Sequence, residues 1–167
     1  VDHPPQILIG VADRKVDFVV GGGVGAVLHG VERVTMDLDV AVRMEPANLR
    51  RFLEAMKDMG LEPKMPVPAE ILVEEANVRA LQEQKGALVF SFRDPRDPIR
   101  VVDLFIKPEL SYEALSPGSV SVDLRGRSIR VVSKQRLLAI KQSVKPMRPK
   151  DELDIAALRA MIESQDD

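Results

Sequence analysis

The chain has 167 residues, of which 45% are hydrophobic and 30% are charged, and it contains no cysteine. This length predicts one domain with a sizeable core, and the lack of cysteine excludes a disulfide scaffold, a thiolate metal site and a cysteine nucleophile. No uncharged stretch is long enough to span a membrane, and no signal-peptide pattern precedes the first helix. We therefore expect a soluble, cytoplasmic protein, whose start at Val1 suggests a trimmed or incomplete N-terminus.

Helices and short strands are predicted from hydrophobic periodicity and from proline and glycine punctuation. In chain order they are a helix at 7–14, a strand at 17–20, a glycine turn at 21–23, a helix at 24–29, a strand at 36–43 and a helix at 46–59. After a loop at 64–68 come a helix at 69–84, strands at 87–92 and 99–107, a hairpin of 120–124 with 128–132, and helices at 133–144 and 149–163.

This order predicts an α+β fold, in which helices pack on one mixed β-sheet and two further helices close the chain. We expect a single domain over residues 1–167. Its core would span about 17–107, and the hairpin and C-terminal helices would span about 119–164.

Two aspartates stand out in the predicted strand at 36–43. Residues i and i+2 of a strand face the same side, with Cα atoms about 6.5–7 Å apart, so Asp37 and Asp39 would project from one surface while Leu38 enters the core. Two carboxylates placed in this way can bind hard cations such as Mg²⁺. The alternative is a half-exposed strand with an acidic outer face, although aspartate is depleted in strands.

A third carboxylate, Asp103, interrupts the apolar row of Ile99, Val101 and Phe105 on one face of its strand. A buried unpaired charge costs several kcal/mol, so this side chain needs a partner. A metal ion shared with Asp37 and Asp39 would supply one, and an ion pair with an arginine is the alternative.

The glycine turn that follows the strand at 17–20 suggests phosphate binding. The pattern Gly21-x-Gly23-x-x-Ala26 matches a loose dinucleotide-binding turn. The context argues against that interpretation, because the following helix is short and no repeated βαβ units come after it. A P-loop is excluded, since the sequence has no Gly-x-x-x-x-Gly-Lys-Ser/Thr pattern.

Two longer patterns point to a known superfamily. The first is Gly22-Gly23-x-Gly25-x-x-x-His29-Gly30-x-x-Arg33-x-Thr35-x-Asp37-x-Asp39. The second is Leu138-Ala139-Ile140-Lys141 followed by Arg148-Pro149-Lys150-Asp151-x-x-Asp154. Together they resemble the DNA polymerase β-type nucleotidyltransferases, and most closely the small prokaryotic branch that resembles the AbiE abortive-infection toxins.

The resemblance implies a Mg²⁺- or Mn²⁺-dependent transfer of a nucleoside monophosphate from a nucleoside triphosphate to an acceptor hydroxyl. Asp37, Asp39 and Asp103 would be the catalytic metal ligands, and Asp103 could also activate the acceptor. The residues implied in nucleotide binding are Gly22, Gly23, Lys141, Arg148 and Lys150. For Asp151 and Asp154, at the start of the last helix, we expect only a complement to the helix dipole, and for His29 a packing or capping role.

One departure separates this chain from many members of the superfamily, which have a serine after the first glycine where this chain has Gly23. The serine hydroxyl would contact the triphosphate, and here a backbone amide would have to serve. Three alternatives stay open: an inactive module that binds nucleotide or a partner protein, as in a toxin–antitoxin pair; a transferase that modifies an antibiotic; and a dinucleotide-binding oxidoreductase.

Charge is distributed unevenly, although the formal net charge is only −2. Nine basic residues and no acidic residue lie between positions 125 and 150. They are Arg125, Arg127, Arg130, Lys134, Arg136, Lys141, Lys145, Arg148 and Lys150. A basic surface of this kind suits phosphates. The alternative is a solvated helix face together with a hairpin edge protected by arginines. If Arg125, Arg127 and Arg130 flank the site, an RNA acceptor is plausible. A protein or small-molecule acceptor is equally compatible with the sequence.

Overall fold

The computed structural model describes residues 3–84 and 87–165. Its helices are α1 (His3–Asp13), α2 (Gly22–Leu28), α3 (Pro46–Asp58), α4 (Glu75–Glu83), α5 (Tyr112–Leu115), α6 (Lys134–Ser143) and α7 (Pro149–Gln165), with 3-10 helices η1 (Ala69–Val73) and η2 (Pro108–Leu110). Its strands are β1 (Phe18–Gly21), β2 (Leu38–Val42), β3 (Glu62–Pro63), β4 (Val89–Asp94), β5 (Asp97–Phe105), β6 (Val120–Leu124) and β7 (Arg127–Val131).

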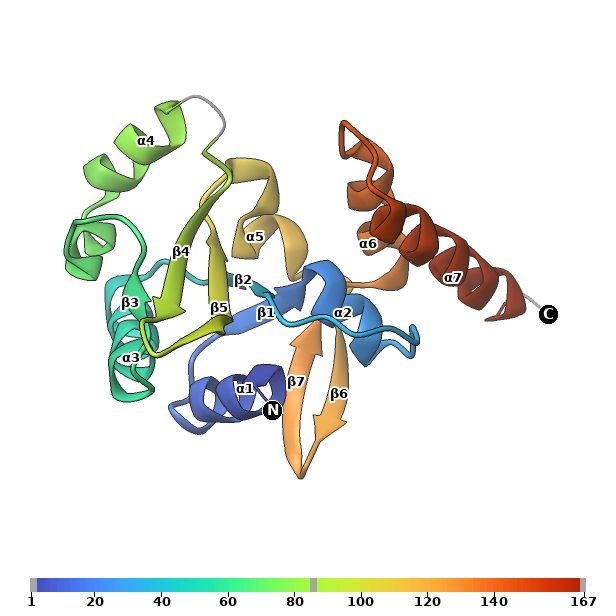
Figure 1. The fold of residues 1–167 in the computed structure, drawn as a ribbon, viewed down its shortest axis with the longest axis horizontal. Coiled ribbons are helices and arrows are strands. Elements are labelled where there is room, and N and C mark those ends of the chain that lie inside the picture. Colours follow the sequence, from blue (N-terminus) through green and yellow to red (C-terminus); the bar gives the residue numbers. More distant parts are fainter. Residues whose placement is uncertain (1–2, 85–86, 166–167) are drawn as a thin grey trace.

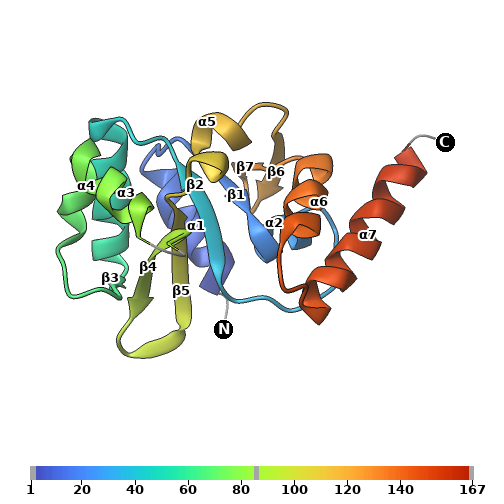
Figure 2. The same ribbon diagram turned by 90° about the horizontal axis from the view of Figure 1, so that it is seen from above.

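Within the described residues, the strands form one seven-stranded mixed sheet in the order β3-β4-β5-β2-β1-β7-β6 (Figure 1). The pairs β2–β5 and β1–β7 are parallel, and the other neighbours are antiparallel. Helices cover both faces of this sheet, and α7 lies outermost beside α6 (Figure 2). The predicted α+β class, with a mixed sheet and two C-terminal helices, is confirmed.

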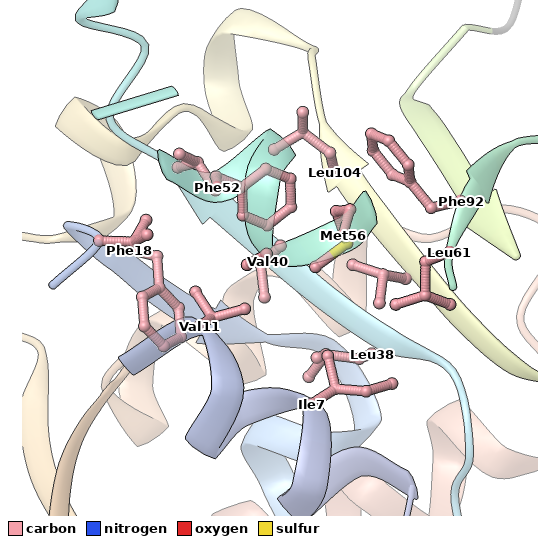
Figure 3. Close-up of a cluster of buried hydrophobic side chains, with 14 of the residues drawn as sticks. Ile7, Val11, Phe18, Leu38, Val40, Phe52, Met56, Leu61, Phe92 and Leu104 are labelled. Atoms are coloured by element: carbon pink, nitrogen blue, oxygen red, sulfur yellow. The ribbon is translucent and has the colours of Figure 1, made fainter. Parts of the chain in front are cut away.

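The largest hydrophobic cluster lies between the sheet and the pair α1 and α3 (Figure 3). Leu38 and Val40 of β2 point into it, because alternate residues of a strand share a face. Phe52 of α3 meets Phe92 of β4 edge to face, with ring centroids 5.9 Å apart. This packing anchors the central strands from one side.

The opposite face of the sheet carries a second cluster that includes Val19, Ala41, Leu115, Leu137 and Leu158. It seats α5, α6 and α7 against the sheet. Helix α6 begins where the sequence predicts, since the hydroxyl oxygen of Ser133 accepts a hydrogen bond from the Arg136 amide at 3.1 Å.

The structure differs from the predicted elements in three respects. The expected helix at 69–84 is divided at Glu74, which has φ −91° and ψ 121°. An unbroken helix would place Leu72 and Leu81 on opposite sides, because nine residues turn a helix by about 900°; the break lets both side chains be buried. The short elements β3, η2 and α5 were not predicted.

Of the described helices, none combines the length and apolar composition needed to cross a bilayer.

The expected strand at 36–43 begins only at Leu38. Asp37 therefore lies in the preceding loop and is exposed, whereas Asp39 is half-buried on the strand. Because Leu38 and Val40 face α1 and α3, Asp39 faces the side of the sheet that carries α5 and α6.

Candidate functional site

A row of residues crosses four neighbouring strands near the middle of the sheet. Ser91 of β4 pairs with Asp103 of β5, Asp103 pairs with Asp39 of β2, and Asp39 pairs with Gly21 at the end of β1. Residues paired directly across strands place their side chains on the same face. The sheet register therefore brings two of the predicted carboxylates side by side, next to the glycine turn.

These residues open into a cavity of about 270 Å³ between the sheet, α6 and the start of α7. Its lining contains every nucleotide-binding and catalytic residue that the sequence predicts: Gly22, Gly23, Asp37, Asp39, Asp103, Lys141, Arg148 and Lys150. Arg33, Thr35 and Asp151, which also belong to the sequence patterns, line the same cavity. The fold thus gathers positions that lie up to 130 residues apart in the chain, from Gly21 to Asp151.

Gly22 is required at the turn for two reasons. Its φ is +59°, in the left-handed region that side chains other than glycine rarely adopt. A Cβ atom there would also overlap the Asp39 carboxylate. Glycine therefore lets the turn backbone lie directly against Asp39, so that a phosphate on the turn and a cation on the carboxylate would be neighbours.

Asp39 carries the most unusual electrostatics of the site. Burial, together with the negative charges of Asp103 and Asp37, raises its pKa to about 7, and Lys141 and Lys150 only partly offset this increase. The carboxylates of this cavity repel one another in the protein alone. A bound cation would relieve that repulsion.

In the described part of the chain, no three acidic or histidine side chains converge on one point as a preformed metal cage. The donor chemistry nevertheless fits Mg²⁺. This ion usually binds through one or two carboxylates together with substrate phosphates, and not within an all-protein cage. Asp39 and Asp103 are two carboxylates in register, and the glycine turn lies beside them.

The partner of Asp103 is a residue that the sequence analysis missed. The hydroxyl of Ser91 donates a hydrogen bond to Asp103 Oδ1 at 2.5 Å. The sequence signal was available, because Ser91 stands between Phe90 and Phe92, and strand alternation sends it away from the core that they fill. The arginine partner considered as an alternative is replaced here by a hydroxyl.

The two C-terminal aspartates have a larger role than the sequence analysis assigned. Asp151 and Asp154 are fully buried, and Lys141 Nζ lies 2.8 Å from Asp154 Oδ2 and 3.6 Å from Asp151 Oδ1. Arg148 pairs with Asp151 at 2.7 Å. Arg33 pairs with Asp154 through two hydrogen bonds, of 2.7 and 3.0 Å. The expectation of a simple helix-dipole complement is wrong, because these carboxylates hold the basic residues of the cavity.

The same network shows where the predicted phosphate ligands stand. Lys141 is buried and paired with both aspartates, whereas Arg148 and Lys150 are exposed at the cavity rim.

His29 has the packing role that we expected. Its Nε2 lies 2.7 Å from the carbonyl oxygen of Val132, and burial lowers its pKa.

The arginines of the hairpin do not surround this cavity. Strand β7 runs parallel to β1, with Val131 beside Val20, so the turn that joins β6 and β7 lies at the end of the sheet away from Gly21. Arg125 and Arg127 belong to that far end, where Arg127 pairs with Asp13 of α1. The basic stretch of sequence is thus divided between two ends of the sheet.

Comparison with solved structures identifies the fold. The lincosamide antibiotic adenylyltransferase LnuA, with lincomycin bound, aligns with a TM-score of 0.59 and 15% identity, over 92% of this chain and 95% of that one. The antibiotic-resistance factor ANT(2″)-Ia, in complex with adenylyl-2″-tobramycin, aligns with a TM-score of 0.54 and 15% identity, over 97% of this chain and 95% of that one. A nucleotidyltransferase-like protein from Paracoccidioides brasiliensis gives 0.55 and 15%, over 96% and 77%.

No family model and no curated protein matches the sequence. The structural neighbours show that the chain has the nucleotidyltransferase fold, as the sequence patterns predict. The strand pairing of this chain argues against the dinucleotide-binding alternative. Strand β2 pairs antiparallel to β1 after α2, so the glycine turn does not begin a βαβ unit.

Proposed function

We propose that the protein is a Mg²⁺-dependent nucleotidyltransferase, which moves a nucleoside monophosphate from a nucleoside triphosphate to an acceptor hydroxyl. The observation that carries this proposal is the single cavity in which a glycine turn, aspartates on paired strands and basic side chains meet. Mn²⁺ is the alternative cation, since carboxylate oxygens suit both ions.

Each part of the cavity would have a separate task. Backbone amides at Gly22 and Gly23 would hold the triphosphate, and Lys141, Arg148 and Lys150 would neutralise its charge. Asp39, Asp103 and Asp37 would hold the metal, which when bound would lower the pKa of the acceptor hydroxyl and offset charge on the phosphates. The acceptor oxygen would then bond to the α-phosphorus as pyrophosphate leaves, and Asp103 would take the acceptor proton.

A small molecule is the acceptor that the surroundings favour. Two structural neighbours are described with an antibiotic or its adenylylated product bound. The lining of the cavity also includes the apolar side chains of Phe105, Leu137 and Ile140. Arg125 and Arg127, which could have recruited RNA, lie at the other end of the sheet. RNA and protein hydroxyls remain the comparison acceptors in any assay.

The AbiE-like branch, with a toxin–antitoxin or phage-defence role and a cognate partner protein, remains a prediction from the two sequence patterns. The buried contacts of Lys141 and Asp154 join the second pattern to Arg33 of the first, so both patterns belong to one site. Growth arrest on expression, reversed by Asp39→Asn, would support it, whereas unchanged growth of the expressing cells would count against it.

Calorimetric titration with each of the four nucleoside triphosphates, with and without Mg²⁺, tests the proposal. We expect metal-dependent binding of at least one triphosphate, lost in Asp39→Asn and in Asp37→Asn. Asp123→Asn, on the exposed face of β6, is the matched control and should bind as the parent does. Transfer at the parent rate by Asp39→Asn would refute the site assignment, and a lack of binding by the parent would leave a partner-binding module as the better hypothesis.

A further inference from the structure

The space beside Gly23 is already filled by two side chains from the loop before β2. A Cβ atom at position 23 would collide with the Arg33 guanidinium and would lie 2.9 Å from Thr35 Oγ1. Any residue larger than glycine must therefore displace Arg33. The serine found here in many proteins of the superfamily that the sequence resembles would project into the same space.

Arg33 is held firmly in that position. Its Nε and Nη2 donate to the two carboxylate oxygens of Asp154, at 2.7 and 3.0 Å, and Nη1 donates to the Val34 carbonyl at 3.3 Å. Its side chain is only 16% exposed and lines the cavity. A guanidinium has five N–H groups, so these contacts with described residues leave two for a ligand.

Three basic side chains, Arg33 among them, share two carboxylates. In the described part of the chain, Arg33, Lys141 and Arg148 pair with only two carboxylates, those of Asp151 and Asp154. Asp154 has Lys141 as a partner even without Arg33. Lys141 also offsets the charge of Asp39, so a metal ion bound to Asp39 would leave one positive charge of this network for a phosphate group next to the glycine turn.

We propose that Arg33 is a triphosphate-binding residue that takes the place of the serine side chain, and that position 23 is glycine because Arg33 occupies its side-chain space. This inference rests on the proposed nucleotide site and deepens it. Arg33 would donate to the β- or γ-phosphate from the side, and Asp154 would keep the guanidinium plane fixed. The function of the serine hydroxyl would thus be supplied by a residue ten positions further along the chain.

Four proteins test this exchange: the parent, Gly23→Ser, Arg33→Ala and the double variant. Each is titrated with the triphosphate that the parent binds and with the monophosphate of the same nucleoside, in Mg²⁺. We expect Arg33→Ala to weaken triphosphate binding about 10- to 100-fold, as for a lost charged hydrogen bond, and to change monophosphate binding by less than about twofold. Gly23→Ser should also weaken triphosphate binding, because the serine displaces Arg33.

The double variant gives the deciding result. It should bind triphosphate better than Arg33→Ala does, because the serine side chain then needs only a small shift of Thr35 and can donate its hydroxyl. If the double variant loses as much binding free energy as the two single variants lose together, the argument that both side chains share one space would be overturned. Equal weakening of monophosphate and triphosphate by Arg33→Ala would show a structural role only.

Two controls protect these conclusions. Arg127→Ala removes another doubly bonded arginine–aspartate pair, outside the cavity, and should bind triphosphate as the parent does. Arg33→Lys keeps a positive charge beside Asp154. If Arg33→Ala unfolds, Arg33→Lys must show the selective triphosphate loss, or the inference is wrong. Failure of the parent itself to bind any triphosphate would instead overturn the proposed function, and this inference with it.

Discussion

Ser91 illustrates how a side chain outside the recognised patterns can orient a functional group. Its hydroxyl is fixed by the β4–β5 register directly beside Asp103, and the 2.5 Å hydrogen bond orients the carboxylate. Residues that orient a metal ligand in this way often matter almost as much as the ligand itself. If Asp103 holds the metal as we propose, Ser91 is its positioning residue.

We predict that Ser91→Ala raises the Mg²⁺ concentration needed for half-maximal nucleotide binding by about 10- to 100-fold, the usual cost of losing a partner of a metal ligand. The free energy of unfolding should change by no more than about 1.5 kcal/mol, the net value of one hydrogen bond. Titration with Mg²⁺ at fixed triphosphate, followed by urea unfolding, measures both. Ser121→Ala, on exposed β6, serves as the control, and parent-like Mg²⁺ dependence in Ser91→Ala would contradict the prediction.

At the scale of elements, helices α6 and α7 are joined by charge as well as by apolar packing. Lys141 of α6 reaches Asp151 and Asp154 of α7, and Asp154 also holds Arg33 of the loop before β2. Burial alone would raise the Asp154 pKa, but the hydrogen bonds from Arg33 and Lys141 outweigh it and lower the pKa. The cavity wall is therefore stabilised by the ionised form of this carboxylate.

We predict that Asp154→Asn lowers the free energy of unfolding at pH 7 by about 3–5 kcal/mol, because it leaves buried cations without their partner. Since the folded-state pKa is depressed, the stabilisation is present above the ordinary aspartate value of about 3.9 and is lost as the pH falls through the folded value. The difference between parent and variant should therefore narrow below about pH 4.

Urea unfolding over a range of pH values measures this effect. Asp13→Asn breaks the exposed pair with Arg127 and should cost no more than about 1 kcal/mol, as exposed ion pairs usually do. A stability difference for Asp154→Asn that stays constant from pH 7 to pH 3 would show that packing, and not the charge of Asp154, determines its contribution.

At the scale of the whole molecule, the sheet separates two basic regions. The parallel pairing of β7 with β1 puts the N-terminal end of β7 at the far end of the sheet from the glycine turn. Arg127 and Val131, the two ends of β7, are roughly 13 Å apart at the usual rise per residue of a strand. At 0.1 M salt, the interaction between surface charges more than about 10 Å apart is largely screened.

We predict that Arg127→Glu changes the affinity for Mg²⁺–triphosphate by less than about twofold at 0.1 M salt, because of this screening. Lys150→Glu, at the cavity rim, should weaken the same affinity by roughly tenfold or more, since it reverses a charge beside the phosphates. Calorimetric titration of both variants makes the comparison. A tenfold loss in Arg127→Glu would mean that the hairpin reaches the bound nucleotide.

Several features of this site could be predicted from local signals in the sequence. Alternation of apolar and polar residues was enough to predict that Leu38 enters the core and that Asp39 faces away from it, because side-chain direction in a strand is a local property. For Asp103 the same reasoning predicted only a carboxylate within an apolar row that needs a partner. The glycine turn and the Ser133 cap were likewise local signals. The two sequence patterns then led to the correct fold.

Only the tertiary structure decided which of these residues meet. Asp154 contacts Arg33 across 121 positions of sequence, and Asp103 meets Ser91 and Asp39 through strand pairing. Contacts of this kind depend on how helices and strands pack as a whole, which no local pattern encodes. The late start of β2, the buried role of Asp151 and the place of Arg33 beside Gly23 all follow from that packing, and for this reason the sequence alone did not predict them.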